Sequence, residues 1–285
     1  MIYANHVVKS LEKTDKYDSV LSFQEGYSTK FTSLFHNPNK VAWIHCNYNY
    51  YLPENESELS IYEKYNKIVC VSRYTAKVFV DRYPTLSERT IAIHNIIDSD
   101  RILKLSDSQI DDSRFIKDDF VIISVGRISP VKRFREIPLI ASSLKNKRVQ
   151  FTWYIIGPQD GSGEVSELQN NIERYSVQEC VKWLGGKSNP YPYFKTANLY
   201  VCLSESEACP MVFKEAQLFG LPIVTTDFPS AFEFVNDKQG VIVPYEFLPD
   251  AICQMLNKID SGYKPHKERF DNYEILTKIR AILDK

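Results

Sequence analysis

The stretch LYVCLSESEACPMVFKEAQLFGLPIVT, residues 199–225, contains a complete strand–helix–strand pattern. Continuous apolar runs at 199–203 and 222–225 predict two buried strands. Between them, Pro210 suits the first turn of a helix, and Gly220 is typical of the residue that follows a helix end. Strands joined by a helix are the repeating unit of parallel sheets, so this stretch predicts an α/β fold.

The same alternation extends over most of the chain. The apolar runs are mostly continuous, as expected of strands that helices cover on both faces. We predict strands at 19–23, 41–45, 68–71, 90–93, 120–125, 152–156, 181–183, 199–203, 222–225 and 240–243. Amphipathic segments predict helices at 135–143, 165–175, 211–219, 249–259 and within 266–285. The chain is therefore expected to contain parallel sheets.

Length and composition favour two domains of ordinary globular character. The chain has 285 residues, of which 44% are hydrophobic and 25% are charged. The acidic segment 98–119 interrupts the alternation, and we expect it to connect the domains. This divides the chain into a first domain at 1–99 and a second at 115–265. Within the segment, Asp98-Ser-Asp100 is typical either of a helix N-cap or of a metal-binding acidic pair.

Charge and pattern argue against several classes of protein. Lys and Arg (35) balance Asp and Glu (36), so no net charge attracts the chain to nucleic acid. No apolar run approaches the roughly 18 residues of a membrane span, and the N-terminus lacks the pattern of a signal peptide. The six cysteines are scattered without a Cys-x-x-Cys spacing, which favours a reducing, cytoplasmic location over a disulfide or zinc framework.

Two cations follow the strand predicted at 120–125, in the sequence FVIISVGRISPVKRF at 120–134. Gly126 permits a sharp turn and a close approach of the backbone to a ligand. Arg127 and Lys132 then lie at the carboxyl end of the strand, where ligands of α/β proteins bind. Such a pair suits a diphosphate, and the alternative is a solvated basic helix start.

Two glutamates are separated by eight residues around the start of the helix at 211–219. Glu207 precedes the helix, and Glu215 lies inside it. The free amides at this helix start are a natural phosphate site. The alternative is that Glu207 only stabilises the helix dipole and Glu215 is solvated. The apolar neighbours Val212 and Phe213 make full solvation of Glu215 less favourable.

In their order and spacing, these motifs resemble those of the family 4 glycosyltransferases, which are retaining enzymes of the GT-B fold. That family has a Gly-Arg…Lys element followed by a Glu-x7-Glu element, here Gly126-Arg127…Lys132 and Glu207…Glu215. The resemblance implies two Rossmann-like domains that face each other across a cleft. It also implies a shortened N-terminal, acceptor-side domain at 1–99, joined by a C-terminal helix at 266–285, and a nucleotide-sugar-binding domain at 115–265.

The resemblance implies a donor site for a nucleoside-diphosphate sugar. Arg127 and Lys132 would neutralise the diphosphate as the sugar–phosphate bond breaks. Glu207 and His45 would contact the donor sugar, and together with the two cations they are the expected catalytic residues. Glu215 would bind the ribose hydroxyls. The remaining donor contacts implied are Gly126, Gly185, Lys187, Pro210, Met211 and Val212, with the base against the backbone near 185–187.

On the acceptor side, the expected residues are Glu25 and Tyr48. Tyr48 belongs to the tyrosine-rich segment 47–51, which is either an acceptor loop or a surface loop packed by its own aromatic rings. The alternative for His45 is a satisfied, buried histidine beside Trp43. No metal or other cofactor is expected, because two cations and a helix N-terminus would neutralise the diphosphate.

The sequence thus predicts a retaining, metal-independent glycosyltransferase. It would move a hexose-type sugar from a nucleotide sugar to a saccharide or lipid-linked saccharide acceptor, in bacterial surface polysaccharide biosynthesis. We expect it in the cytoplasm at the inner face of the membrane, associated peripherally. The alternative is a non-catalytic or half-site chain that binds nucleotide sugar or needs a partner chain, because the first domain lacks the glycine-rich loop of the family.

Overall fold

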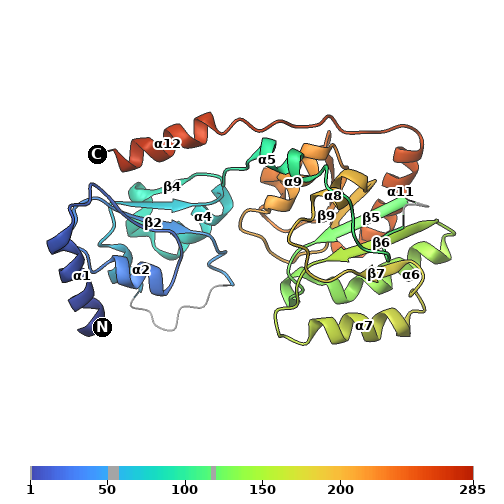
Figure 1. The fold of residues 1–285 in the computed structure, drawn as a ribbon, viewed down its shortest axis with the longest axis horizontal. Coiled ribbons are helices and arrows are strands. Elements are labelled where there is room, and N and C mark those ends of the chain that lie inside the picture. The colour runs from blue at the N-terminus through green and yellow to red at the C-terminus, as the bar shows by residue number, and fades with distance from the viewer. Residues whose placement is uncertain (1, 51–57, 117–119, 285) are drawn as a thin grey trace. The chain divides into compact units, whose positions relative to one another are not determined.

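In the computed structural model, which describes residues 2–50, 58–116 and 120–284, the chain is an α/β protein with two parallel sheets (Figure 1). The predicted α/β class is therefore confirmed. The chain divides into two compact units. Unit 1 comprises residues 1–96, 207–209 and 271–285, and unit 2 comprises residues 97–206 and 210–270.

Unit 1 contains a parallel sheet in the order β1-β2-β3-β4. Its strands are β1 (Val20–Ser22), β2 (Lys40–Ile44), β3 (Lys67–Cys70) and β4 (Thr90–Ala92). Its helices are α1 (Ile2–Thr14), α2 (Tyr27–Thr32), α3 (Glu58–Tyr62), α4 (Arg73–Arg82), the 3₁₀ helix η1 (Pro84–Arg89) and α12 (Tyr273–Leu283). In this arrangement β1 lies at one edge of the sheet.

Each face of this sheet has its own apolar cluster. Ala42 and Ile44 of β2 pack with a group of aromatic rings that includes Phe79 of α4. Val41 and Trp43, which point to the opposite face, belong to a cluster that includes Ile282 of α12. The final helix of the chain therefore packs on the sheet of unit 1, although residues 210–270, which come before it in the chain, belong to unit 2.

Unit 2 contains a parallel sheet in the order β10-β9-β8-β5-β6-β7. Its strands are β5 (Phe120–Val125), β6 (Phe151–Ile156), β7 (Val181–Trp183), β8 (Leu199–Cys202), β9 (Ile223–Thr226) and β10 (Gly240–Val243). Its α-helices are α5 (Ser99–Leu105), α6 (Ile137–Asn146), α7 (Glu164–Arg174), α8 (Tyr191–Thr196), α9 (Met211–Phe219), α10 (Ala231–Phe234) and α11 (Leu248–Asp260). Short 3₁₀ helices are η2 (Pro130–Lys132), η3 (Phe134–Glu136) and η4 (Tyr245–Phe247).

Helices cover both faces of this second sheet. Ile140 of α6, Leu168 of α7 and Ile252 of α11 pack in one large apolar cluster with Trp153 of β6. On the other face, the ring of Phe194 in α8 stacks on Tyr200 of β8 at 5.9 Å between centroids. This double cover explains why the strands are continuous apolar runs, and every strand predicted from the sequence is present with each end within one residue.

The acidic segment predicted to connect two domains belongs to unit 2 instead, from Ile97 onward. The Asp98 carboxylate accepts the amide of Arg101 at 3.0 Å and caps α5, so the N-cap interpretation of this residue is confirmed. Three more of its acids form ion pairs within the same unit, namely Asp100 with Arg269, Asp107 with Lys195, and Asp112 with Arg114 and Lys187. Acidic composition alone does not reveal which of these carboxylates form ion pairs, or with which part of the chain.

The carboxyl ends of β5, β6 and β7 lie side by side at one edge of the sheet and are joined by backbone hydrogen bonds. The Gly126 amide donates to Ile156 O, and the Gly157 amide donates to Gly185 O, both at 2.9 Å. A Cβ at Gly157 would lie only 1.7 Å from the carbonyl oxygen of Gly126. Only glycine therefore fits at position 157, and this close approach fixes the loops that follow the three strands.

We predict that Gly157→Ala lowers the free energy of unfolding by roughly 3 kcal/mol or more, because the added methyl group must push two backbone segments apart. Gly186→Ala is the matched control, since its Cβ would meet Pro158 only at 3.3 Å. It should cost less than about 1 kcal/mol. Urea unfolding of both variants measures the difference, and equal stabilities would contradict the steric argument.

Candidate functional site

The loop after β5 carries two of the predicted cations at the carboxyl edge of the sheet in unit 2. Arg127 is exposed, and Lys132 ends the short helix η2. The Lys132 Nζ lies 3.8 Å from the position that a Cβ would take at Gly126, so the ammonium group lies over this glycine. The structure therefore brings Gly126 and Lys132 together.

The backbone turn that presents Lys132 is held from the side of β8. Arg133, which directly follows η2, has a φ of 53°, a left-handed conformation that costs energy for a residue with a side chain. Its guanidinium pairs with Glu205 at 2.6 Å and lies 5.1 Å above the ring of Tyr245. The amide of Glu205 in turn donates to Val131 O at 2.9 Å. The loops after β5 and β8 are thus tied together.

Helix α9 directly follows the loop after β8. Pro210 is buried at its start, and the half-buried Met211 and Val212 form its first turn. Among the described residues, no side chain caps this helix start, so its first amides are available as hydrogen-bond donors to an anion. Gly220, with a φ of 66°, ends the helix as the sequence predicted.

Glu215 is half-buried in the middle of α9. The hydroxyl of Tyr191, at the start of α8, donates to Glu215 Oε1 at 3.4 Å. Burial raises the pKa of Glu215 to about 7. Burial also raises the pKa of Tyr191 to about 12, and the neighbouring carboxylate adds to this shift. Tyr191 was not among the predicted site residues, because no local sequence signal indicates that its hydroxyl meets a carboxylate 24 residues later in the chain.

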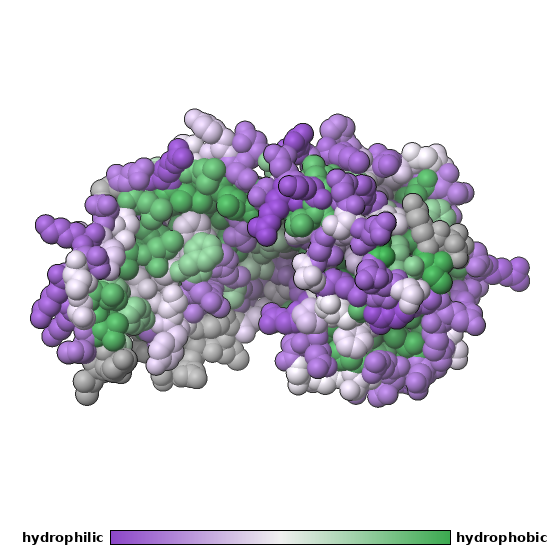
Figure 2. Space-filling model, in the orientation of Figure 1, coloured by the Kyte–Doolittle hydropathy of each residue, from purple (hydrophilic) through white to green (hydrophobic). Residues whose placement is uncertain are grey.

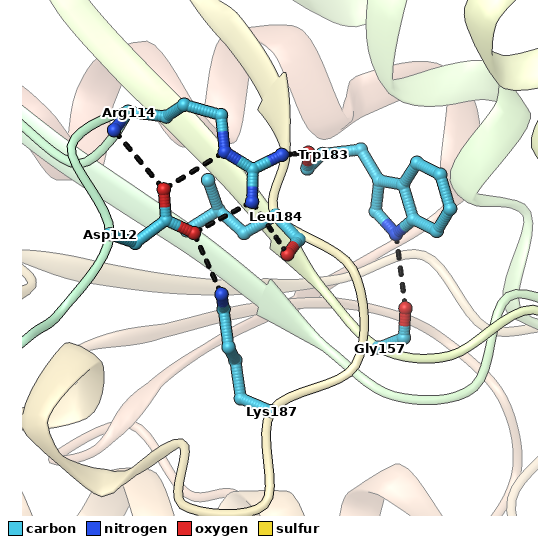
Figure 3. A network of polar contacts seen from close by, with 6 residues as sticks. All are labelled: Asp112, Arg114, Gly157, Trp183, Leu184 and Lys187. Atoms are coloured by element: carbon cyan, nitrogen blue, oxygen red, sulfur yellow. Dashed lines mark hydrogen bonds and ion pairs between the residues drawn. The ribbon is translucent and has the colours of Figure 1, made fainter.

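The loop after β7, where the resemblance puts the nucleobase, is fixed by a polar network (Figure 3). Asp112 accepts from Arg114 and from Lys187, both at 2.7 Å, so the side chain of Lys187 is already engaged. Arg114 also donates to the carbonyl oxygens of Trp183 and Leu184. The sequence analysis missed Asp112 and Arg114, because both lie in the acidic segment taken for a connection.

Within unit 1, the structure brings Glu25 and His45 together at the end of β2. Glu25 Oε1 accepts the amides of His45 and Cys46, the second at 2.6 Å. The ring of Phe23 lies 4.8 Å from that of His45, and burial lowers the pKa of His45. His45 Nε2 is buried and finds no hydrogen-bond partner among the described residues. This is contrary to the alternative that His45 is a satisfied core histidine.

Tyr48 does not lie on an acceptor surface. Its side chain is only 1% exposed, its hydroxyl forms a hydrogen bond with that of Tyr62, and its ring packs edge-on against Phe79 at 5.1 Å. The prediction of an acceptor contact for Tyr48 is therefore wrong, because its ring is packed inside the aromatic cluster of unit 1. Tyr51, from the same tyrosine-rich segment, lies outside the described residues.

The half-buried Glu207 also belongs to unit 1, together with Ala208 and Cys209. Ala208 and Cys209 pack against the apolar cluster on the α12 face of the sheet, and Thr75 Oγ1 donates to Ala208 O at 3.4 Å. The two glutamates of the Glu-x7-Glu element thus belong to different units, with Glu207 in unit 1 and Glu215 in unit 2.

Exposed apolar side chains gather on unit 1. The space-filling view shows green hydrophobic areas on its visible face, whereas the visible face of unit 2 is mostly purple (Figure 2). The exposed large hydrophobic residues of unit 1 are Tyr17, Leu21, Phe23, Tyr27, Tyr50, Ile96, Tyr273 and Leu276. Across the described residues, no helix has both the length and the apolar character needed to cross a membrane.

The two parallel sheets and the motifs of the candidate donor site are shared with a known protein family. The model of the family described as glycosyl transferases group 1 matches residues 106–275, which is more than half of the chain. The chain belongs to this family. The matched range contains the loops after β5, β7 and β8, where the candidate donor residues of unit 2 lie.

Curated relatives are similar over three quarters of this chain. The uncharacterized glycosyltransferase MJ1059 of Methanocaldococcus jannaschii is 27% identical over 223 residues, which cover 75% of this chain and 48% of the relative. The O-antigen biosynthesis glycosyltransferase WbnH of Escherichia coli is 25% identical over 219 residues, which cover 75% of this chain and 58% of the relative. The chain thus spans about half the length of the curated relatives that it matches.

Solved structures share the fold at low sequence identity. Anabaena Alr3699/HepE, in complex with UDP-glucose, has a TM-score of 0.79 at 19% identity over 99% of this chain and 81% of that one. TarM has a TM-score of 0.76 at 17% identity over 98% of this chain and 57% of that one. These likenesses confirm the GT-B fold class and, at such identities, carry the fold alone.

We predict that Glu215→Gln removes a pH dependence of stability. The raised pKa means that the folded parent holds a proton that the unfolded chain releases, so its stability falls by up to about 3 kcal/mol as pH rises from 4.5 to 7. The glutamine variant should lack this fall and be more stable than the parent at pH 8. Urea unfolding between pH 5 and 8 measures the difference.

The control for this experiment is Glu173→Gln, which neutralises an exposed carboxylate on α7. It should leave the pH profile of the parent unchanged. If the Glu215→Gln profile also follows that of the parent, the carboxyl group of Glu215 does not titrate near neutral pH.

Proposed function

We propose that this chain is a retaining glycosyltransferase of family 4. It transfers a hexose-type sugar from a nucleoside-diphosphate sugar to a saccharide or lipid-linked saccharide, and it needs no metal ion. The observation that carries this proposal is the carboxyl edge of the sheet in unit 2. There one loop holds Arg127 and Lys132, tied to the loops after β6 and β8, and Glu215 of α9 is paired with Tyr191.

Each part of that edge matches one part of a nucleotide sugar. Two cations and the uncapped amides at the start of α9 suit the two phosphates. The carboxylate of Glu215 is an acceptor for the paired hydroxyls of a ribose, and its half-buried setting strengthens such hydrogen bonds. The loop at 185–187 is left for the base. Because cations and helix dipole neutralise the diphosphate, transfer proceeds without Mg²⁺ or Mn²⁺ in this proposal.

The proposed chemistry is a front-face displacement. The bond between the anomeric carbon and the β-phosphate oxygen breaks, and the acceptor oxygen forms its bond on the same face of the sugar. The acceptor proton passes to the departing phosphate oxygen. Arg127 and Lys132 stabilise the charge that grows on this phosphate, which is where electrostatic stabilisation lowers a barrier most. In this proposal Glu207 and His45 contact the donor sugar.

Features of unit 1 support a carbohydrate acceptor. Phe23 is 59% exposed beside His45 and Glu25, and an aromatic ring of this kind stacks on a sugar face. The names of relatives in O-antigen biosynthesis favour a surface polysaccharide, and the exposed apolar side chains of unit 1 suit peripheral contact with a lipid-linked acceptor. We propose that the enzyme works at the cytoplasmic face of the membrane.

A second candidate is a chain that binds the nucleotide sugar but transfers only with a partner chain. The observation in its favour is the edge strand β1, where Leu21 and, just beyond it, Phe23 are exposed. An unpaired edge with apolar side chains is a template for another strand. Binding of a nucleotide diphosphate without transfer by the purified chain would favour this candidate.

We predict that one nucleoside diphosphate, within a panel of uridine, guanosine, adenosine and thymidine forms, raises the melting temperature of the chain. Arg127→Ala and Lys132→Ala should each weaken its binding by roughly tenfold or more, because each removes a charge-assisted hydrogen bond. Calorimetric titration measures the affinities. Lys258→Ala, at an exposed position of α11, is the control that changes charge alone. No shift with any nucleotide, in a chain that melts cooperatively, would refute the proposal.

We predict that the chain, given the matching sugar nucleotide and an acceptor saccharide, forms a product with the anomeric configuration of the donor. The yield should be the same with and without EDTA, because no step depends on a metal. Nuclear magnetic resonance of the anomeric proton reports the configuration. An inverted product, or activity lost to EDTA and restored by Mg²⁺ or Mn²⁺, would contradict the mechanism.

A further inference from the structure

Asp112 lies between the side chains of Arg114 and Lys187, beside the loop after β7 (Figure 3). Its side chain is 6% exposed, and its two oxygens accept from Arg114 Nε at 2.9 Å, Arg114 Nη2 at 2.7 Å and Lys187 Nζ at 2.7 Å. The guanidinium of Arg114 and the ammonium of Lys187 hold the pKa of Asp112 well below its usual range. This carboxylate therefore stays charged and keeps both cations in place.

Arg114 reaches beyond its carboxylate to the backbone. Its Nη1 donates to Trp183 O at 3.1 Å, and its Nη2 donates to Leu184 O at 3.0 Å. The planar guanidinium thus joins one carboxylate to two consecutive carbonyl groups, an arrangement that a lysine cannot reproduce. An ordinary surface ion pair does not contact the backbone of a ligand-binding loop.

The same loop is also held from the side of β6. The indole Nε1 of Trp183 donates to Gly157 O at 3.0 Å, and the amide of Gly157 donates to Gly185 O at 2.9 Å. Three consecutive carbonyl oxygens, at 183–185, therefore already accept protein donors. This leaves the backbone of Gly186 and Lys187 to meet the hydrogen-bonding edge of a base.

The segment that carries Arg114 is itself anchored. The hydroxyl of Tyr154 on β6 accepts the amide of Ile116 at 2.7 Å and donates to its carbonyl oxygen at 3.0 Å. The ring of Phe115 lies 4.6 Å from that of Tyr154. Arg114 therefore holds the loop from a fixed point on the sheet.

We propose that Asp112 and Arg114 are positioning residues that set the backbone of residues 185–187 for the nucleobase, and so decide which base the site prefers. This inference rests on the proposed function, because it concerns the base of the same nucleotide sugar. Neither residue touches the ligand. Discrimination by a few backbone groups requires those groups to be fixed within about 0.5 Å, and Arg114 supplies that restraint.

The test measures three ligands against the parent, Arg114→Ala and Asp112→Asn. The ligands are the nucleoside diphosphate that the parent binds best, the next best in the panel, and inorganic pyrophosphate. Both variants should bind the preferred nucleotide at least tenfold more weakly and lose most of their preference between bases. Pyrophosphate should bind within twofold of the parent, because the loop with Arg127 and Lys132 is unchanged. Arg114→Lys should show the same loss of base preference.

Arg135→Ala is the matched control. Arg135 pairs with Glu164 at 2.7 Å, with side-chain exposures of 42% and 5%, against 53% and 6% for Arg114 and Asp112. Its removal leaves a similar buried carboxylate without its arginine but does not free the loop after β7. This variant should lose stability and keep the base preference of the parent.

The outcomes separate this inference from the function on which it rests. If the parent binds a nucleotide and Arg114→Ala keeps its affinity and base preference, the positioning role is refuted and the donor site stands. An equal loss of pyrophosphate binding would mean that the variant disturbs the whole edge, which also refutes a role specific to the base. If the parent binds no nucleotide, the proposed function fails first, and the positioning role fails with it.

Discussion

The carbonyl oxygen of Gly126 occupies the space in which any side chain at Gly157 would begin, and the edge of the second sheet depends on this contact. The backbones at the starts of the loops after β5 and β6 are in contact, and the hydrogen bond from Gly157 to Gly185 O links the loop after β7 to them. Charges on these loops consequently keep a constant spacing. Binding of a diphosphate and a base at the same time requires this, since errors near 1 Å lose much of the benefit of preorganisation.

Two kinds of electrostatic arrangement occur at the candidate site residues of the two units. The carboxylate of Asp112 is paired with the cations of Arg114 and Lys187, so its charge is compensated where it lies. Glu215 and His45 are different, because burial raises the pKa of Glu215 and lowers that of His45, and both shifts favour the neutral form. The hydrogen bond from Tyr191 and the charge of Glu25 oppose these shifts only in part. Such groups lower the free energy of unfolding, and the apolar packing of each unit offsets this loss. A bound ligand that supplies hydroxyl donors would relieve this cost, which is why these positions suit a binding site.

Much of this could be predicted from the sequence. The positions of the strands follow from continuous apolar runs, and the bounds of α9 follow from Pro210 and Gly220. The sequence left Asp98 with two interpretations, a helix N-cap or a metal ligand, and the structure shows the N-cap. The prediction for Tyr48 failed because a tyrosine-rich loop and a buried aromatic cluster have the same composition. The ion pairs of the acidic segment could not be predicted either, because the partners Lys195 and Arg269 are distant in the chain.

The sequence by itself determined the α/β class, the order of strands and helices, which loop carries Arg127 and Lys132, and which helix carries Glu215, because apolar periodicity, turns and caps are local properties of the chain. Only the tertiary structure decided which groups meet. Tyr191 reaches Glu215, and Arg114 reaches the end of β7, across 24 and 70 residues of sequence. Burial and pairing depend on how distant segments pack, and that packing sets the pKa values and the geometry on which a site depends.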